Sequence, residues 1–185
     1  MRILCFDTES SHYFHSQRWQ YGNDESFIAA RLAEAGTMSS KAFYGAVIYD
    51  FARREYREFS KKDIHRLVGV LARADLLISH SGTYKDFVIL EDFCGREALA
   101  LILEKPHYDL YRDRSYEAVE DAARRLFPKQ EDEARKKKLA RQSIGGSHFY
   151  LAKARYDVEM TWRIAVREQS FRTLRESVDR QLKID

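Results

Sequence analysis

The chain opens with a short apolar run that ends at acidic residues. Ile3-Leu4-Cys5-Phe6 is solidly apolar, and Asp7 and Glu9 follow it closely. Such a run, bounded by polar residues, is typical of a buried strand. Four later segments also have strand patterns, because they are apolar or rich in β-branched and aromatic residues. These segments are 42–49, 53–59, 75–80 and 107–111.

Other segments repeat apolar residues at the spacing of a helix. Helices are predicted over 24–36, 60–71, 87–93, 96–104, 115–127 and 147–183. Ser60-Lys61-Lys62-Asp63 resembles a capping box in which Asp replaces the usual Glu. Strands that alternate with helices predict an α/β fold, with a mixed sheet flanked by helices and a long C-terminal helical region.

Composition narrows the class of protein. The 185 residues suit one compact domain, and the hydrophobic fraction of 44% argues against global disorder. No apolar run approaches the ~20 residues that span a bilayer, and the N-terminal run is too short and too acidic for a secretory signal. Cys5 and Cys94 are interpreted as buried thiols of a reducing compartment. We therefore expect a soluble, cytoplasmic protein with no membrane partner.

Charge is distributed unevenly along the chain. The net charge of +3 divides into −1 over residues 1–100 and +4 over 101–185. A mildly basic second half is compatible with a phosphate-bearing partner. It is equally compatible with solvated helix faces, so charge alone does not choose between them.

Three groups of acids are candidate metal ligands. Asp7 and Glu9 lie two positions apart on a strand, so they share one face, and hard cations such as Mg²⁺ and Mn²⁺ favour such oxygen ligands. Asp86 follows a predicted strand and a Gly-containing turn, and Asp157 lies within the last predicted helix. Taken singly, these acids also suit an exposed strand end, a favourable helix start and a solvated helix position.

The order of these segments resembles the motifs of the DEDD superfamily of 3′–5′ exonucleases, which have a ribonuclease-H-like fold. Phe6-Asp7-Thr8-Glu9 is similar to the first motif, and Tyr156-Asp157-Val158-Glu159-Met160-Thr161 to the third. The segment from Leu77 to Asp86, with Phe87 and Leu90, is similar to the second. The resemblance covers residues 1–167, which leaves 168–185 as a C-terminal helical extension.

The resemblance implies a site and an activity. Asp7, Glu9, Asp86 and Asp157 would bind two divalent ions, Mg²⁺ or Mn²⁺, for hydrolysis of DNA or RNA from the 3′ end. Single-stranded 3′ ends are the expected partner, because no duplex-reading helix motif is present. Three residues within the motifs would contact the nucleic acid: Thr8, Ser81 and Lys85.

The chain departs from the family pattern at several positions. Ser81 stands where the family has Asn, and Lys85, interpreted as solvated, stands where it has an aromatic residue. The family's general base, Tyr or His, is replaced by Lys153 or Ala152. Lys153 lies one helical turn before Asp157 and therefore shares its face of the helix. If the pKa of its amine is lowered, it can accept a proton and act as the base. It could equally neutralise a carboxylate or touch phosphate.

Several other residues and segments are candidates for a role at the site. Tyr150 and His148 are alternative bases, although they also suit a core aromatic residue and a surface loop residue. Asp109 is a candidate support behind the site, but the pattern favours an ordinary acid at a strand end. The basic tract 129–141 is a candidate nucleic-acid contact or a flexible, solvated loop, and the aromatic residues of 13–19 could stack on a base or pack on the core. The C-terminal helix could serve self-association, a protein partner or nucleic acid. Alternative functions are a structure-specific endonuclease or resolvase on the same fold, and a catalytically inactive nucleic-acid-binding module.

Overall fold

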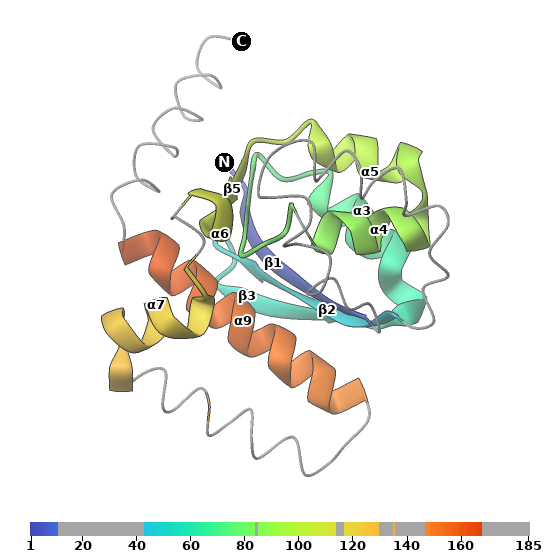
Figure 1. The fold of residues 1–185 in the computed structure, drawn as a ribbon. Helices are drawn as coiled ribbons and strands as arrows, with labels where there is room; N and C mark the ends of the chain where they lie inside the picture. Colours follow the sequence, from blue (N-terminus) through green and yellow to red (C-terminus); the bar gives the residue numbers. More distant parts are fainter. Residues whose placement is uncertain (11–42, 84, 114–116, 130–134, 136–146, 168–185) are drawn as a thin grey trace, which may run out of the picture.

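A five-stranded mixed sheet forms the centre of the molecule (Figure 1). The computed structural model describes residues 1–10, 43–83, 85–113, 117–129, 135 and 147–167. The strands are β1 (Ile3–Ser10), β2 (Phe43–Asp50), β3 (Glu55–Phe59), β4 (Leu76–Ser79) and β5 (His107–Asp109). Their order is β3-β2-β1-β4-β5. Strand β2 is antiparallel to β1 and β3, whereas β1, β4 and β5 are parallel. The predicted α/β class with a mixed sheet is confirmed.

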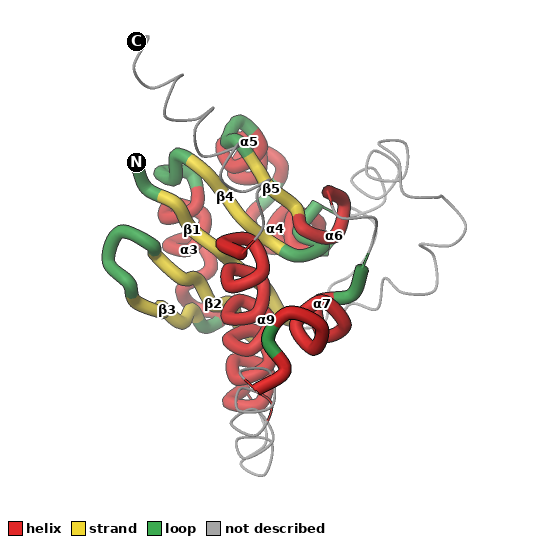
Figure 2. The backbone as a smooth tube through the Cα atoms, turned by 90° about the vertical axis from the view of Figure 1, so that its left-hand side faces the viewer, coloured by secondary structure: helices red, strands yellow, loops and turns green. Residues whose placement is uncertain are grey.

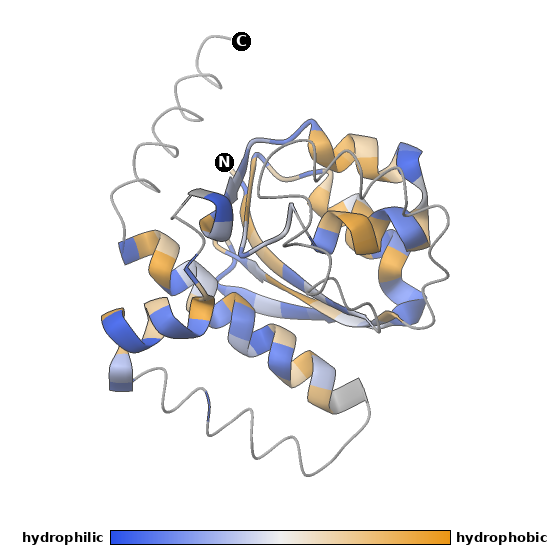
Figure 3. Cartoon of the chain, in the orientation of Figure 1, coloured by the Kyte–Doolittle hydropathy of each residue, from blue (hydrophilic) through white to orange (hydrophobic). Residues whose placement is uncertain are grey.

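Helices cover both faces of this sheet (Figure 2). On one face lie α3 (Ile64–Leu71), α4 (Asp86–Cys94) and α5 (Arg96–Leu103). On the other lie α7 (Val119–Leu126) and α9 (Ser147–Arg167), while the short α6 (Leu110–Asp113) follows β5 directly. These helices carry both apolar and polar residues (Figure 3), and their buried apolar residues pack with those of the sheet.

The alternation of side chains along β1 divides the core into two layers. Leu4 and Phe6 pack with α3, α4 and α5, whereas Ile3 and Cys5 pack with α7 and α9. Cys5 is buried beneath α9, as predicted, and its Sγ lies 3.7 Å from the carbonyl oxygen of Val158. Cys94 is only partly buried, so the prediction of a buried thiol is wrong for it.

Strand β1 extends further than the apolar run predicts. Its first three residues pair with β4, but pairing with β2 continues to Ser10. Among the described residues, the polar end of β1 therefore has a strand neighbour on one side only. On the other side, the backbone N–H of Thr8 donates to the carboxylate of Asp86, at the start of α4. Asp7 and Glu9 thus lie within the strand, as the sequence predicts.

The remaining elements largely follow the sequence pattern. The backbone N–H of Ser60 and its hydroxyl donate to Oδ2 of Asp63 at 3.3 and 2.7 Å, which supports the predicted capping box. The short strand β5 ends at Asp109 and not at residue 111, because the chain turns there into α6. The predicted helix 24–36, the proposed extension 168–185 and the end of the predicted helix 147–183 lie outside the described residues.

Candidate metal centre

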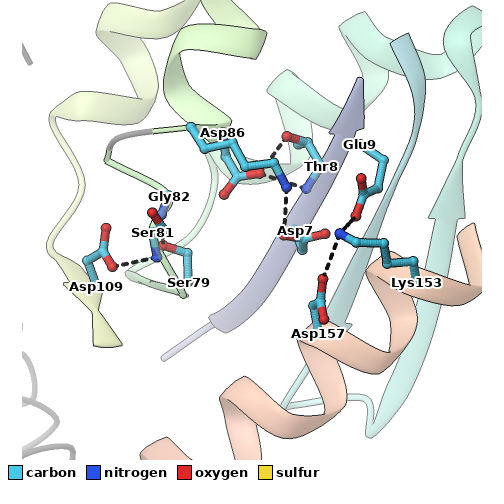
Figure 4. Close-up of polar contacts among 11 residues, drawn as sticks. Asp7, Thr8, Glu9, Ser79, Ser81, Gly82, Asp86, Asp109, Lys153 and Asp157 are labelled. Atoms are coloured by element: carbon cyan, nitrogen blue, oxygen red, sulfur yellow. Dashed lines mark hydrogen bonds and ion pairs between the residues drawn. The ribbon is translucent and has the colours of Figure 1, made fainter. Parts of the chain in front are cut away.

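Three carboxylates converge where β1 meets α9 (Figure 4). Asp7 and Glu9 both point towards α9 because odd-numbered side chains of β1 face that helix. Gly45, opposite Glu9 on β2, lets α9 come close, since a Cβ at this position would lie 2.6 Å from Cδ2 of Leu151. Asp157 on α9 completes the group, and one oxygen of each of the three carboxylates lies within 4.8 Å of the others. The shared face predicted for Asp7 and Glu9 is confirmed.

Burial makes this convergence electrostatically costly. Asp7, Glu9 and Asp157 are 7%, 6% and 8% exposed. Burial raises the pKa of Asp7 well above its usual 3.8, and the charges of Asp86, Glu9 and Asp157 raise it further, while the Lys85 ammonium opposes the shift. The cluster therefore needs positive charge before all its members can ionise.

Asp86 lies beside this cluster on the opposite face of β1. Its side chain is fully buried at the first residue of α4, and its Oδ1 accepts hydrogen bonds from the backbone N–H of Thr8, at 2.7 Å, and from the Thr8 hydroxyl. Burial raises the pKa of Asp86, although Lys85 and the Thr8 donors oppose it. Because even-numbered side chains of β1 face α4, Thr8 is fully buried and positions Asp86. This leaves no surface of Thr8 for the nucleic-acid contact that the resemblance implies.

Several buried carboxylate oxygens have no hydrogen-bond partner among the described residues. At this site they are Oδ2 of Asp7, Oδ2 of Asp86 and Oδ1 of Asp157. A buried acceptor without a donor costs about 1–3 kcal/mol, so each such group needs an explanation, of which a bound ion is one. An all-oxygen donor set suits hard divalent cations. The cluster of Asp7, Glu9 and Asp157 could hold a metal ion.

Two lysines contact the same carboxylates. The Nζ of Lys153 donates to Oε1 of Glu9 and lies 3.1 Å from Oδ2 of Asp157. The Nζ of Lys85 lies 3.8 Å from Oδ1 of Asp7. The interpretation of Lys85 as solvated is therefore wrong, since only 28% of its side chain is exposed. The ion pair of Lys85 with Asp7 was not predicted from the sequence. A signal for it was present, because four converging acids require counter-charges and Lys85 is next to Asp86 in the sequence.

The protonation of Lys153 differs from the prediction. Burial acts to lower the pKa of its ammonium, but the charges of Asp157, Asp7 and Glu9 outweigh burial and raise this pKa above 10.5. A lowered pKa is therefore wrong for Lys153, and the raised pKa favours the other predicted role, in which it neutralises a carboxylate, because three carboxylates stabilise the charged form. A protonated ammonium has no lone pair to accept a proton, so Lys153 in this arrangement acts as a counter-cation.

The loop between β4 and α4 is held from behind by Asp109. This fully buried carboxylate accepts backbone N–H groups of Ser81 at 2.7 Å, Thr83 at 2.9 Å and Tyr111 at 3.1 Å. The loop needs this support because Ser81 has a left-handed φ of 66°. Gly82 is required within it, since a Cβ there would lie 2.1 Å from the Oγ of Ser79. Asp109 thus fixes the loop that leads into Asp86 and also stands at the end of β5, so it is the strand-end acid that the sequence favours and at the same time a support for this loop.

The other candidates fall into two groups. Tyr150 stacks on Tyr44 with ring centroids 3.8 Å apart, so its ring is engaged with β2. The side chain of His148 lies outside the described residues, as do the aromatic residues of 13–19 and almost all of the tract 129–141. Within the described part of the chain, no helix is long and apolar enough to cross a membrane.

Comparison with known proteins does not identify this site. No family model, curated protein or solved structure matches the chain. The chemistry of the site is therefore inferred from its geometry and from the motifs that the sequence carries.

Proposed function

We propose that the protein is a metal-dependent 3′–5′ exonuclease that hydrolyses phosphodiester bonds of DNA or RNA with two divalent ions, Mg²⁺ or Mn²⁺. One observation carries this proposal: the carboxylates of Asp7 and Glu9 on β1 and of Asp157 on α9, a distant part of the sequence, each place one oxygen within 4.8 Å of the others and are buried. Asp86 adjoins them through Thr8. The motif order of the DEDD superfamily and this convergence support the same conclusion.

The charge of the site favours cation-dependent chemistry. When all four carboxylates are ionised, the two ammonium groups of Lys85 and Lys153 do not balance them, and the excess negative charge would repel a phosphodiester. Asp7, Glu9, Asp86 and Asp157 would hold the ions. Bound divalent ions would lower the pKa of an attacking water and stabilise the charge that develops on the phosphate.

The location of the site also supports this function. Asp7 and Glu9, the loop after β4 and Asp109 lie at the carboxyl ends of parallel strands, where open α/β sheets bind their ligands. Side chains of Lys85 and Lys153 keep 28% and 32% exposure there, so both could reach a phosphate. Ser81 is partly exposed at the same edge. We propose single-stranded 3′ ends as the substrate, a ribonuclease-H-like fold for residues 1–167, and a location in the cytoplasm.

A second candidate function is a catalytically inactive nucleic-acid-binding module. The position of Lys153 favours it, because this lysine stands where the family has its general base and pairs with Glu9 and Asp157. An inactive module would retain nucleic-acid binding without cleavage.

A labelled-strand assay separates these functions from each other and from an endonuclease. A 5′-labelled single strand is incubated with the full chain and Mn²⁺ or Mg²⁺. We expect a ladder that shortens from the 3′ end and disappears with EDTA or in Asp7→Asn. Asp121→Asn is the control, since Asp121 pairs with Arg124 on the exposed surface of α7. One discrete internal cut would indicate an endonuclease, and binding without cleavage the inactive module.

A further inference from the structure

Lys153 lies where a cation shared by Glu9 and Asp157 would lie. Its Nζ donates to Glu9 and is 3.1 Å from Asp157, so one ammonium joins β1 to α9 (Figure 4). Both carboxylates belong to the only group of potential metal ligands found among the described residues. A divalent ion and this ammonium therefore require the same oxygens.

Two further oxygens of the cluster favour a cation with more charge than the ammonium of Lys153. Oδ2 of Asp7 and Oδ1 of Asp157 are buried and accept no hydrogen bond within the described part of the chain. Asp7 as a whole is 7% exposed, and its nearest ammonium, from Lys85, is 3.8 Å from its other oxygen. A lysine has one point charge, whereas a divalent ion could join all three carboxylates at once.

We propose that Lys153 is an internal counter-cation that a divalent ion must displace, and that it thereby sets the ion concentration at which the site fills. The proposal rests on the proposed function, since it concerns the same metal site. Displacement is feasible because 32% of the Lys153 side chain is exposed and its stem is flexible. Lys153 and Asp157 both belong to α9, so the Lys153 side chain can turn away from Glu9 while the helix and Asp157 stay in place.

Competition of this kind is a coupling between two cations and is measurable as one. Coupling between two ligands typically changes affinity about 5- to 150-fold. We therefore expect Lys153→Met, which keeps the length of the side chain and removes its charge, to lower the dissociation constant for Mn²⁺ about tenfold or more. Lys153→Arg retains the positive charge and should remain within about threefold of the unchanged chain.

The test is calorimetric titration of the full chain with Mn²⁺ alone, without nucleic acid. Lys62→Met is the matched control, because Lys62 is exposed on a distant turn before α3. Circular dichroism checks folding, and thermal unfolding gives a second readout. Without Mn²⁺, Lys153→Met should unfold at a lower temperature than the unchanged chain, since Glu9 and Asp157 lose their counter-charge. With saturating Mn²⁺ this difference should shrink or reverse.

The outcomes distinguish this inference from the proposed function. Tighter Mn²⁺ binding in Lys153→Met supports the inference, whether or not the unchanged chain cleaves nucleic acid. Equal or weaker binding in Lys153→Met overturns it and leaves the proposed exonuclease standing if the unchanged chain binds Mn²⁺. Absence of Mn²⁺ binding in every variant overturns both. If Lys153→Met does not fold in EDTA, failure of Mn²⁺ to restore its fold overturns the inference.

Discussion

Asp109 is expected to contribute more to stability than any surface acid, because three backbone donors depend on it. Replacing it by Ala leaves the N–H groups of Ser81, Thr83 and Tyr111 without their acceptor. Each buried donor left unpaired costs about 1–3 kcal/mol. Ser81 is only partly buried, so water can reach its N–H, and we expect a total loss of about 3–5 kcal/mol in the free energy of unfolding.

Thermal unfolding monitored by circular dichroism measures this loss. A chain of this size changes its midpoint by about 2–4 °C per kcal/mol, so Asp109→Ala should unfold about 6–20 °C lower. Asp109→Asn keeps one acceptor oxygen and should lose about half as much. Asp121→Ala on exposed α7 is the control and should stay within about 2 °C. A decrease of less than about 3 °C in the unfolding midpoint of Asp109→Ala would refute the view that this carboxylate holds the loop before Asp86.

Three further predictions concern the loop, the acid cluster and the aromatic residues beside α9. Gly82→Ala should destabilise the chain by about 1–3 kcal/mol in urea unfolding, because its Cβ would lie 2.1 Å from Oγ of Ser79; an unchanged midpoint would contradict this close packing. Burial holds the pKa of Asp7 above 3.8, so in EDTA the native state binds more protons than the unfolded chain and loses stability as pH rises above 3.8. Asp7→Asn should therefore gain stability relative to the unchanged chain as pH increases, and a pH-independent difference in urea unfolding would argue against the shift. Tyr56→Phe removes the acceptor 2.9 Å from Nε1 of Trp162 and should cost about 1 kcal/mol by the same assay, whereas no change would mean that water replaces it.

The elements of the fold could be predicted largely from local pattern. The apolar run at Ile3 marks β1, and alternation along a strand is enough to place Asp7 and Glu9 on one face. The capping residue Ser60 marks the start of the next helical segment in the same way. Such features depend on residues that are close together in the sequence, so a local pattern is enough to predict them.

Contacts between distant segments could not be predicted in this way. The extension of β1 to Ser10 depends on pairing with β2, and the pKa of Lys153 depends on acids that α9 meets only after folding. The ion pair of Lys85 could not be predicted for the same reason, because its partner Asp7 is 78 positions away. In each case the decisive interaction joins elements whose relative placement a local pattern does not contain.

Anomalous diffraction from crystals soaked in Mn²⁺ tests the central claim most directly. We expect a peak bonded to carboxylate oxygens of Asp7, Glu9 and Asp157, with the ammonium of Lys153 moved away from Glu9. Asp7→Asn crystals treated in the same way should lack that peak or show it greatly weakened. An ordered cluster without anomalous density, with Lys153 still between Glu9 and Asp157 at saturating Mn²⁺, would contradict the account.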